Sequence, residues 1–144
     1  MQLVIYSEDP KTLETVSQEV TKFDRKLIDL VNTMFRTVEL NQAVGLAAIQ
    51  LGVPKRVLVI SDPYKQYKVA MVNPKIIEQS ELYVTQQEGC LSFPGKSKKI
   101  KRPKSVTVEY KNLTGSTCII ELEDFTARIF FHEYDHLEGI VCMK

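Results

Sequence analysis

The sequence predicts an α+β fold in which antiparallel strands and a hairpin pack around a C-terminal helix, with an amphipathic helix near the N-terminus. Three observations support this prediction. Apolar residues recur at helical spacing in residues 23–40, residues 105–110 alternate, and helical spacing returns after Asp124. The chain of 144 residues is long enough to bury its own core, so we expect one domain over residues 1–144.

The N-terminal helix is expected over residues 23–40, with Asp24 in position to cap its first turn. The apolar positions that recur on one face are Leu27, Val31, Met34, Phe35 and Val38. This face is expected to pack on the core.

The middle of the chain is rich in strand-forming residues. Residues 55–61 and 68–77 contain β-branched side chains bounded by turns, which favours strands. In residues 105–122 an alternating stretch runs through NLTG into a second apolar stretch, which predicts a hairpin. After Asp124 a helix is expected to run to Gly139, which suits a C-terminal cap.

Composition excludes several classes of protein. The net charge of +1 argues against bulk attraction to DNA or membranes, and no apolar run is long enough to span a bilayer. Three cysteines without a CxxC pair indicate a reducing compartment, and the first residues do not resemble an export signal. Residues 96–104 contain six basic side chains, which we interpret as a solvated loop and strand edge.

The two histidines of the chain, His132 and His136, lie four residues apart in HEYDH. On a helix both point to one side and can bind one metal ion, and Glu133 lies near enough to reach a water on it. This is the HExxH pattern of two ligands and a general base. Phe125 and Ile129 share the histidine face, which favours the edge of the core over a solvated surface.

A third ligand has to come from upstream of the histidines. Cys90, in EGCLSFPG, is the best candidate because its thiolate suits Zn²⁺ or Fe²⁺, although most free cysteines are small buried apolar residues. We expect Cys90 to lie in a tight, irregular segment. In AVGLAAIQLG, Gly45 allows a close backbone approach and Gln50 is the one long polar side chain. The alternative is a packing contact with Gln50 facing solvent.

The segments GLAAIQ, EGCLS and HEYDHLEG, in this order and spacing, resemble the peptide deformylase family over nearly the whole chain. The resemblance implies a metal held by Cys90, His132 and His136, with Glu133 as the acid/base. It also implies that Gln50 and the backbone N–H of Leu91 hold the oxyanion. The residues then expected along the substrate site are Val44, Gly45, Glu88, Gly89, Phe125, Arg128 and Ile129, with Glu88 paired to Arg102.

The reaction implied by the resemblance is removal of the N-formyl group from N-formylmethionyl nascent peptides, with release of formate. A water on the metal would attack the formyl carbon, and Glu133 would pass its proton to the leaving amine. A Cys/His₂ site suits Fe²⁺, Zn²⁺, Ni²⁺ or Co²⁺. The resemblance implies Fe²⁺ in the cell.

The chain departs from the family pattern at three places. Ala43 stands where the family usually has glycine, and Phe131 stands where glutamine commonly precedes the first histidine. Bacterial members usually continue beyond HLxG, but short forms occur, some of them carried by bacterial viruses. We therefore expect a short form that acts as a monomer in the cytoplasm of a bacterial cell, phage-infected or not, and docks weakly or not at all on ribosomes.

Two other classes stay open at this point. One is an HExxH metallopeptidase that cuts internal peptide bonds, against which an upstream cysteine ligand argues. The other is a non-catalytic RNA-binding module, suggested by the basic residues 96–104.

Overall fold

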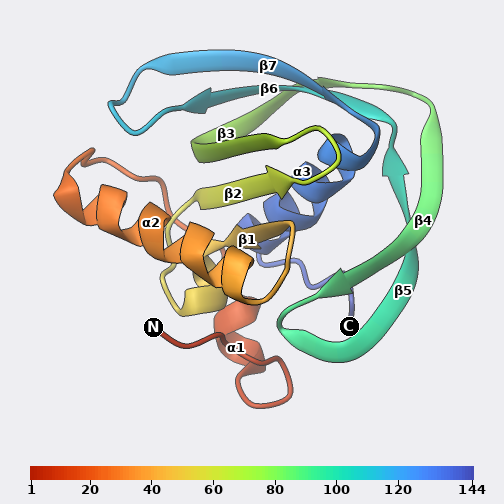
Figure 1. The fold of residues 1–144 in the computed structure, drawn as a ribbon, viewed down its shortest axis with the longest axis horizontal. Coiled ribbons are helices and arrows are strands. Elements are labelled where there is room, and N and C mark those ends of the chain that lie inside the picture. Colours follow the sequence, from red (N-terminus) through yellow and green to blue (C-terminus); the bar gives the residue numbers. More distant parts are fainter.

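The protein has three layers, with a five-stranded antiparallel sheet between helices α2 and α3 (Figure 1). The computed structural model describes residues 1–144. In chain order the elements are α1 Pro10–Leu13, α2 Arg25–Leu40, β1 Gly45–Ala47, the 3-10 helix Ala48–Leu51, β2 Val57–Asp62, β3 Tyr67–Gln79, β4 Tyr83–Cys90, β5 Phe93–Pro103, β6 Ser105–Lys111, β7 Thr117–Glu123 and α3 Asp124–Leu137. The sheet has the order β1-β2-β3-β6-β7, and β4 pairs with β5 in a separate ribbon. The predicted α+β class is confirmed.

Strand β2 explains why the sheet carries a helix on each face. Leu58 and Ile60 pack in the core that includes α3, whereas Val57 and Val59 pack in the core that includes α2. Successive side chains of a strand point to opposite faces, so the four consecutive apolar residues that begin β2 have to be covered on both sides. The predicted strand over residues 55–61 is therefore a central strand.

Helix α2 begins where the sequence predicts. The carboxylate of Asp24 caps it by accepting a hydrogen bond from the Leu27 N–H at 3.2 Å. The predicted apolar face is buried at every position except Phe35, which is half-buried at the edge of the core. None of the helices has the length and apolar content that crossing a bilayer requires.

The predicted hairpin of residues 105–122 is confirmed as β6 and β7, which pair from Ser105–Glu123 to Lys111–Thr117. Its turn is organised by the Asn112 side chain, whose Oδ1 accepts hydrogen bonds from the backbone N–H groups of Thr114 and Ser116. Asparagine commonly stabilises turns in this way.

The β4–β5 ribbon was not predicted. Cys90, expected in an irregular segment, is the last residue of β4, at a bulge beside Gly89. Most of residues 96–104, expected as a loop and strand edge, belong to β5. The ribbon is mainly polar on both faces, so it lacks the alternation of apolar and polar residues by which a strand is recognised in sequence.

Helix α3 begins at Asp124, as predicted, and the chain turns at Gly139 with a φ of +71°. Apolar residues after Gly139 clasp the end of the helix onto the core. Met143 is buried and Val141 packs against the α3 core, but Ile140 is 52% exposed. The clasp is therefore made without Ile140, which faces solvent.

We predict that Gly139→Ala destabilises the protein more than Gly52→Ala. Both glycines have positive φ, so alanine costs about 1–2 kcal/mol at either position. A Cβ at Gly139 would also lie 2.7 Å from the backbone oxygen of Glu14, whereas a Cβ at Gly52 meets nothing within 4 Å. This clash should add at least about 1 kcal/mol. Urea unfolding of both variants at the same metal loading measures the difference, and equal losses would contradict the prediction.

Candidate active site

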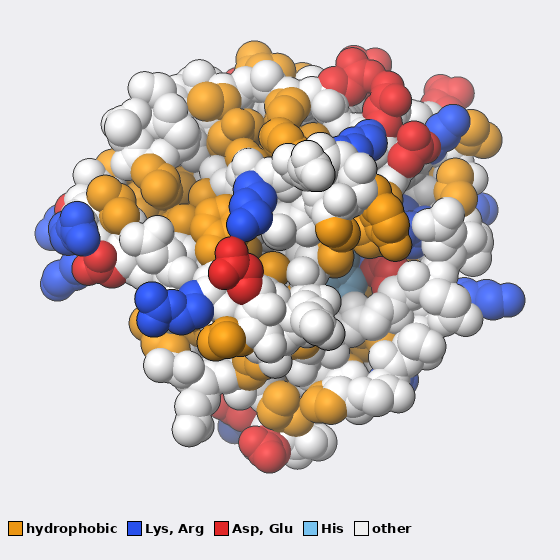
Figure 2. Space-filling view, in the orientation of Figure 1, with side chains coloured by type: hydrophobic (Ala, Val, Ile, Leu, Met, Phe, Trp, Pro, Cys, Tyr) orange, Lys and Arg blue, Asp and Glu red, His pale blue; other side chains and the backbone are white.

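A cleft of about 670 Å³ opens between β1, the β4–β5 ribbon and α3. Figure 2 shows it as a hollow in the surface, with part of a histidine visible inside. The residues predicted along the substrate site all line this cleft: Val44, Gly45, Glu88, Gly89, Phe125, Arg128 and Ile129. The structure therefore brings together side chains from segments that are far apart in the sequence.

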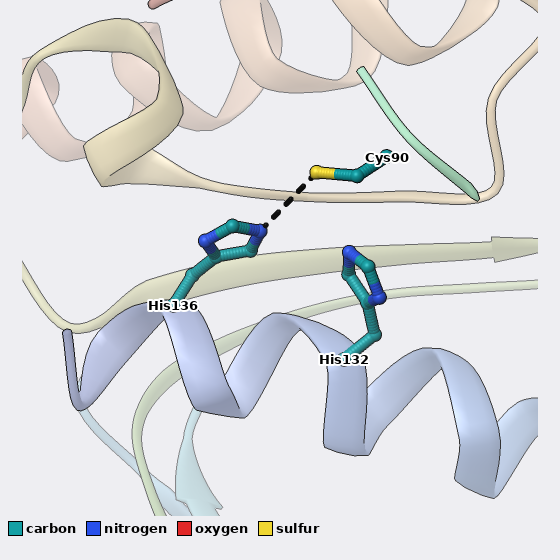
Figure 3. Close-up of side chains that lie close together, drawn as sticks. All are labelled: Cys90, His132 and His136. Atoms are coloured by element: carbon teal, nitrogen blue, oxygen red, sulfur yellow. Dashed lines mark hydrogen bonds between the residues drawn. The ribbon is translucent and has the colours of Figure 1, made fainter. Parts of the chain in front are cut away.

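Cys90, His132 and His136 meet beside this cleft (Figure 3). Their ligand atoms all lie within 4.8 Å of one another, and the Cys90 Sγ is 3.5 Å from the His136 Nε2. The two histidines lie one turn apart on α3, and the cysteine comes from the end of β4. The helix alone fixes the distance between the two histidines. The position of the Cys90 thiol relative to them depends on how the ribbon packs against the helix.

This donor set fits a metal ion. Sulfur and nitrogen ligands at about 2.3 and 2.0–2.1 Å from a tetrahedral metal lie about 3.6 Å apart, close to the observed 3.5 Å. Burial lowers the pKa of His136 to about 3, so its ring is neutral, which is the form that binds metals. One thiol and two imidazoles would leave a fourth position open in the cleft.

Glu88 orients His132 through a hydrogen bond. Its Oε1 lies 2.8 Å from the His132 Nδ1, so Nδ1 donates to Glu88 and a metal would bind through Nε2. Burial would lower the pKa of His132, but hydrogen bonds with Cys142, Cys90 and Glu88 raise it, so a metal would have to displace the Nε2 proton. Arg102 binds both oxygens of the same carboxylate at 3.0 Å, as predicted, and also reaches Asp135. Burial would raise the pKa of Glu88, but hydrogen bonds from His132 and Arg102 lower it to about 2. The carboxylate is therefore a permanent acceptor.

Glu133 is the buried acid of the site. The residue is 4% exposed, and its Oε1 has no hydrogen-bond partner. Burial raises its pKa to about 7, and the neighbouring His132 offsets part of this rise. A carboxyl group with this pKa can both accept and donate a proton near neutral pH.

Gly45 allows β1 to pass directly over this acid. A Cβ at position 45 would lie 2.7 Å from the Ile129 Cγ2 and 2.8 Å from the Glu133 Oε2. Only glycine fits between the strand and the helix without displacing one of these side chains.

Gln50 is buried, so the alternative of a solvent-facing side chain is wrong. Its Oε1 accepts a hydrogen bond from the Ala47 N–H at 3.0 Å, which fixes the orientation of the amide. The Nε2 then donates to the Ser92 Oγ at 3.1 Å and lies 3.6 Å from the Cys90 Sγ. Ser92 was not singled out from the sequence, because a lone serine in a turn carries no distinguishing signal.

Two placements differ from expectation. Arg128 lines the cleft, but its guanidinium is turned away to Glu88 and to backbone carbonyls. Cys142, for which the sequence offers no ligand pattern, has its Sγ 3.7 Å from the His132 Nδ1 and forms a second cluster with Glu88 and His132. The cause is the turn at Gly139, which brings the last residues back along α3.

A soft donor set beside a buried, unpaired carboxyl group is the equipment of a metal-dependent hydrolase. Known proteins that are similar in sequence and structure belong to this class. A family profile described as polypeptide deformylase matches residues 1–144. A peptide deformylase of Finegoldia magna is 42% identical over 134 residues, which are 93% of this chain and 83% of the relative.

Solved structures give the same result. The peptide deformylase of Ehrlichia chaffeensis in complex with actinonin has a TM-score of 0.93 and 39% identity, covering 98% of this chain and 85% of the other. The peptide deformylase of Thermotoga maritima has a TM-score of 0.91 and 37% identity, covering 97% and 92%. The chain belongs to the polypeptide deformylase family of hydrolases, and the resemblance seen in the sequence is confirmed.

We predict that Gly45→Ala destabilises the protein by about 1–3 kcal/mol, because the added methyl group has to displace Ile129 or Glu133. Gly89→Ala is the matched control, since a Cβ there meets only the Lys96 backbone oxygen at 3.8 Å. Chemical unfolding of both variants measures the difference. A Gly45→Ala variant as stable as Gly89→Ala would show that the helix and strand can separate freely.

Proposed function

We propose that this chain hydrolyses the formyl amide of N-formylmethionyl peptides, releasing formate and a free methionine amine. The observation that carries the proposal is the unpaired, buried carboxyl group of Glu133 beside the cysteine–histidine cluster, in a chain of the polypeptide deformylase family. The family depends on a metal, and the cleft is large enough for an extended peptide end.

Cys90, His132 and His136 are the residues that would hold the metal. A bound divalent ion would polarise the formyl carbonyl and acidify the attacking water. The donor set suits Fe²⁺, Zn²⁺, Ni²⁺ or Co²⁺, and we propose Fe²⁺ in the cell and Zn²⁺ as the more stable substitute.

Glu133 moves the proton. Its free Oε1 accepts the proton of the water that attacks the formyl carbon. The same carboxyl group then delivers this proton to the amine nitrogen as the carbon–nitrogen bond breaks. The raised pKa of about 7 suits both steps, because neither protonation state is strongly preferred near neutral pH.

Gln50 and Leu91 stabilise the charge that develops on the formyl oxygen. The Gln50 Nε2 is already directed toward the cluster, because the Ala47 N–H holds the other end of its amide. The Leu91 backbone N–H follows Cys90 directly and supplies a second donor. Donors fixed in place before the reaction lower the barrier more than donors that have to reorient.

The methionine side chain is proposed to lie against Val44, Phe125 and Ile129. These residues line the cleft from two elements, the turn into β1 and the first turns of α3. The pocket is apolar, and one wall is the aliphatic part of Arg128, whose charged end is engaged elsewhere.

The proposal predicts formate release from a formyl-Met tripeptide and no cleavage of an internally bonded, N-blocked peptide. Glu133→Gln should lower kcat at least about a hundredfold while the metal content stays unchanged, because glutamine has nearly the same shape but cannot accept a proton. Formate is measured by a coupled assay and metal by elemental analysis. Cleavage of the blocked peptide instead would favour the metallopeptidase alternative, and a Glu133→Gln variant with most of its activity would refute the role of Glu133.

Cys90→Ala should weaken metal binding at least about a hundredfold, because even the loss of a residue that supports a ligand costs about 10–100-fold. Cys118→Ala is the control, since Cys118 lies on β7, donates to the Ser116 carbonyl and belongs to neither cluster of ligand atoms. Cys142 is not a neutral control because it touches His132. Metal content after dialysis is the measurement, and equal contents in the two variants would refute Cys90 as a ligand.

A further inference from the structure

The β4–β5 ribbon carries Glu88 and Cys90 but lies outside the five-stranded sheet (Figure 1). No sheet hydrogen bonds therefore tie it to the core that supports α3. The turn after Cys90 is held by the Tyr6 N–H, which donates to the Ser92 carbonyl at 2.9 Å, and by Gln50. Along its length, the ribbon is held to the helix that carries the histidines by side chains that cross between the two elements.

Arg128 crosses from the helix to both strands of the ribbon. Its Nη2 donates to the Val84 carbonyl of β4 at 2.6 Å, and its Nη1 donates to the Ile100 carbonyl of β5 at 3.0 Å. The same Nη1 donates to the Glu88 Oε2 at 2.6 Å. The side chain is 6% exposed, so water competes little for its donors.

Arg102 makes the reciprocal crossing at another point. It extends from β5, binds Glu88 in a bidentate manner and reaches Asp135 on α3 at 2.6 Å. Arg128 alone binds carbonyls of both strands. The rigid guanidinium fork fixes three acceptors in one plane, which a flexible ammonium group cannot do.

We propose that Arg128 is a positioning residue that fixes the ribbon against α3 and thereby sets the position of Cys90 relative to His132 and His136. The importance of the distance between Cys90 and the histidines rests on the proposed function. The contact between Arg128 and the ribbon does not. It also limits the sequence-based assignment of Arg128 to the aliphatic part that lines the cleft, because the guanidinium faces the ribbon.

The test compares Arg128→Met with Arg56→Met. Arg56 is a matched control because it is also a largely buried arginine that binds α3, donating to the Leu137 carbonyl and the Glu138 carboxylate, but it does not touch the ribbon. Two quantities are measured on the zinc-loaded full chain. One is the rate of Zn²⁺ transfer to a chromogenic chelator, and the other is amide hydrogen exchange in residues 83–103.

We expect Arg128→Met to release Zn²⁺ at least about tenfold faster than the unchanged protein, with faster exchange in the ribbon, because supporting residues of metal sites act on this scale. Arg56→Met should leave both quantities near their original values. If Arg128→Met does not fold, Arg128→Lys should show the same two changes to a smaller extent, because lysine keeps the charge but not the fork.

Three results would overturn the proposal. The first is unchanged zinc release and ribbon exchange in the variant that folds. The second is the same change in Arg56→Met, which would indicate a general effect of losing a buried arginine. The third is a raised KM for formyl peptide with both other readouts unchanged, which would return Arg128 to substrate binding. If the unchanged protein releases no formate, the proposed function is refuted. Amide hydrogen exchange in the ribbon still tests the contact with Arg128 in that case.

Discussion

The buried carboxylate of Glu88 accepts hydrogen bonds from Arg102, Arg128 and His132, and the arrangement of the cleft depends on it. A buried charge without partners would cost several kcal/mol, so the three donors and the acceptor stabilise one another. Asp135 binds the outer side of Arg102, so the two arginines are balanced by two carboxylates. Ribbon, helix and imidazole are thus held in one orientation by a group that does not itself contact the reacting amide in the proposed mechanism.

The parts of the fold that could be predicted are those specified by local sequence. Asp24 and the helical spacing of the apolar residues that follow it are sufficient to locate α2. The turn at Asn112, between two apolar stretches, is sufficient to predict that β6 pairs with β7. The β4–β5 ribbon could not be found in this way, because its strands are mainly polar on both faces and are held by contacts to α3. Tertiary contacts decide the structure wherever the local pattern is ambiguous.

The same division applies to the site. His132 and His136 were recognisable because one helix turn separates them, and Glu133 because it lies between them. Cys90 and Gln50 could be named only through their family resemblance or their unusual polarity in an apolar segment. The direction of the Arg128 head, the partner of Gln50 and the position of Cys142 depend on residues 10 to 42 positions away. No sequence pattern specifies such distant contacts.

The cleft is also a place where distant parts of the chain are joined. Cys90 and His136 are 46 residues apart in sequence, and the whole β6–β7 hairpin lies between them. An ion shared by the two would act as a cross-link, closing a long loop and reducing the entropy of the unfolded chain by the equivalent of up to about 4 kcal/mol. Metal binding and folding are therefore linked equilibria. Removing the metal with a chelator is expected to lower the free energy of unfolding as well as the activity.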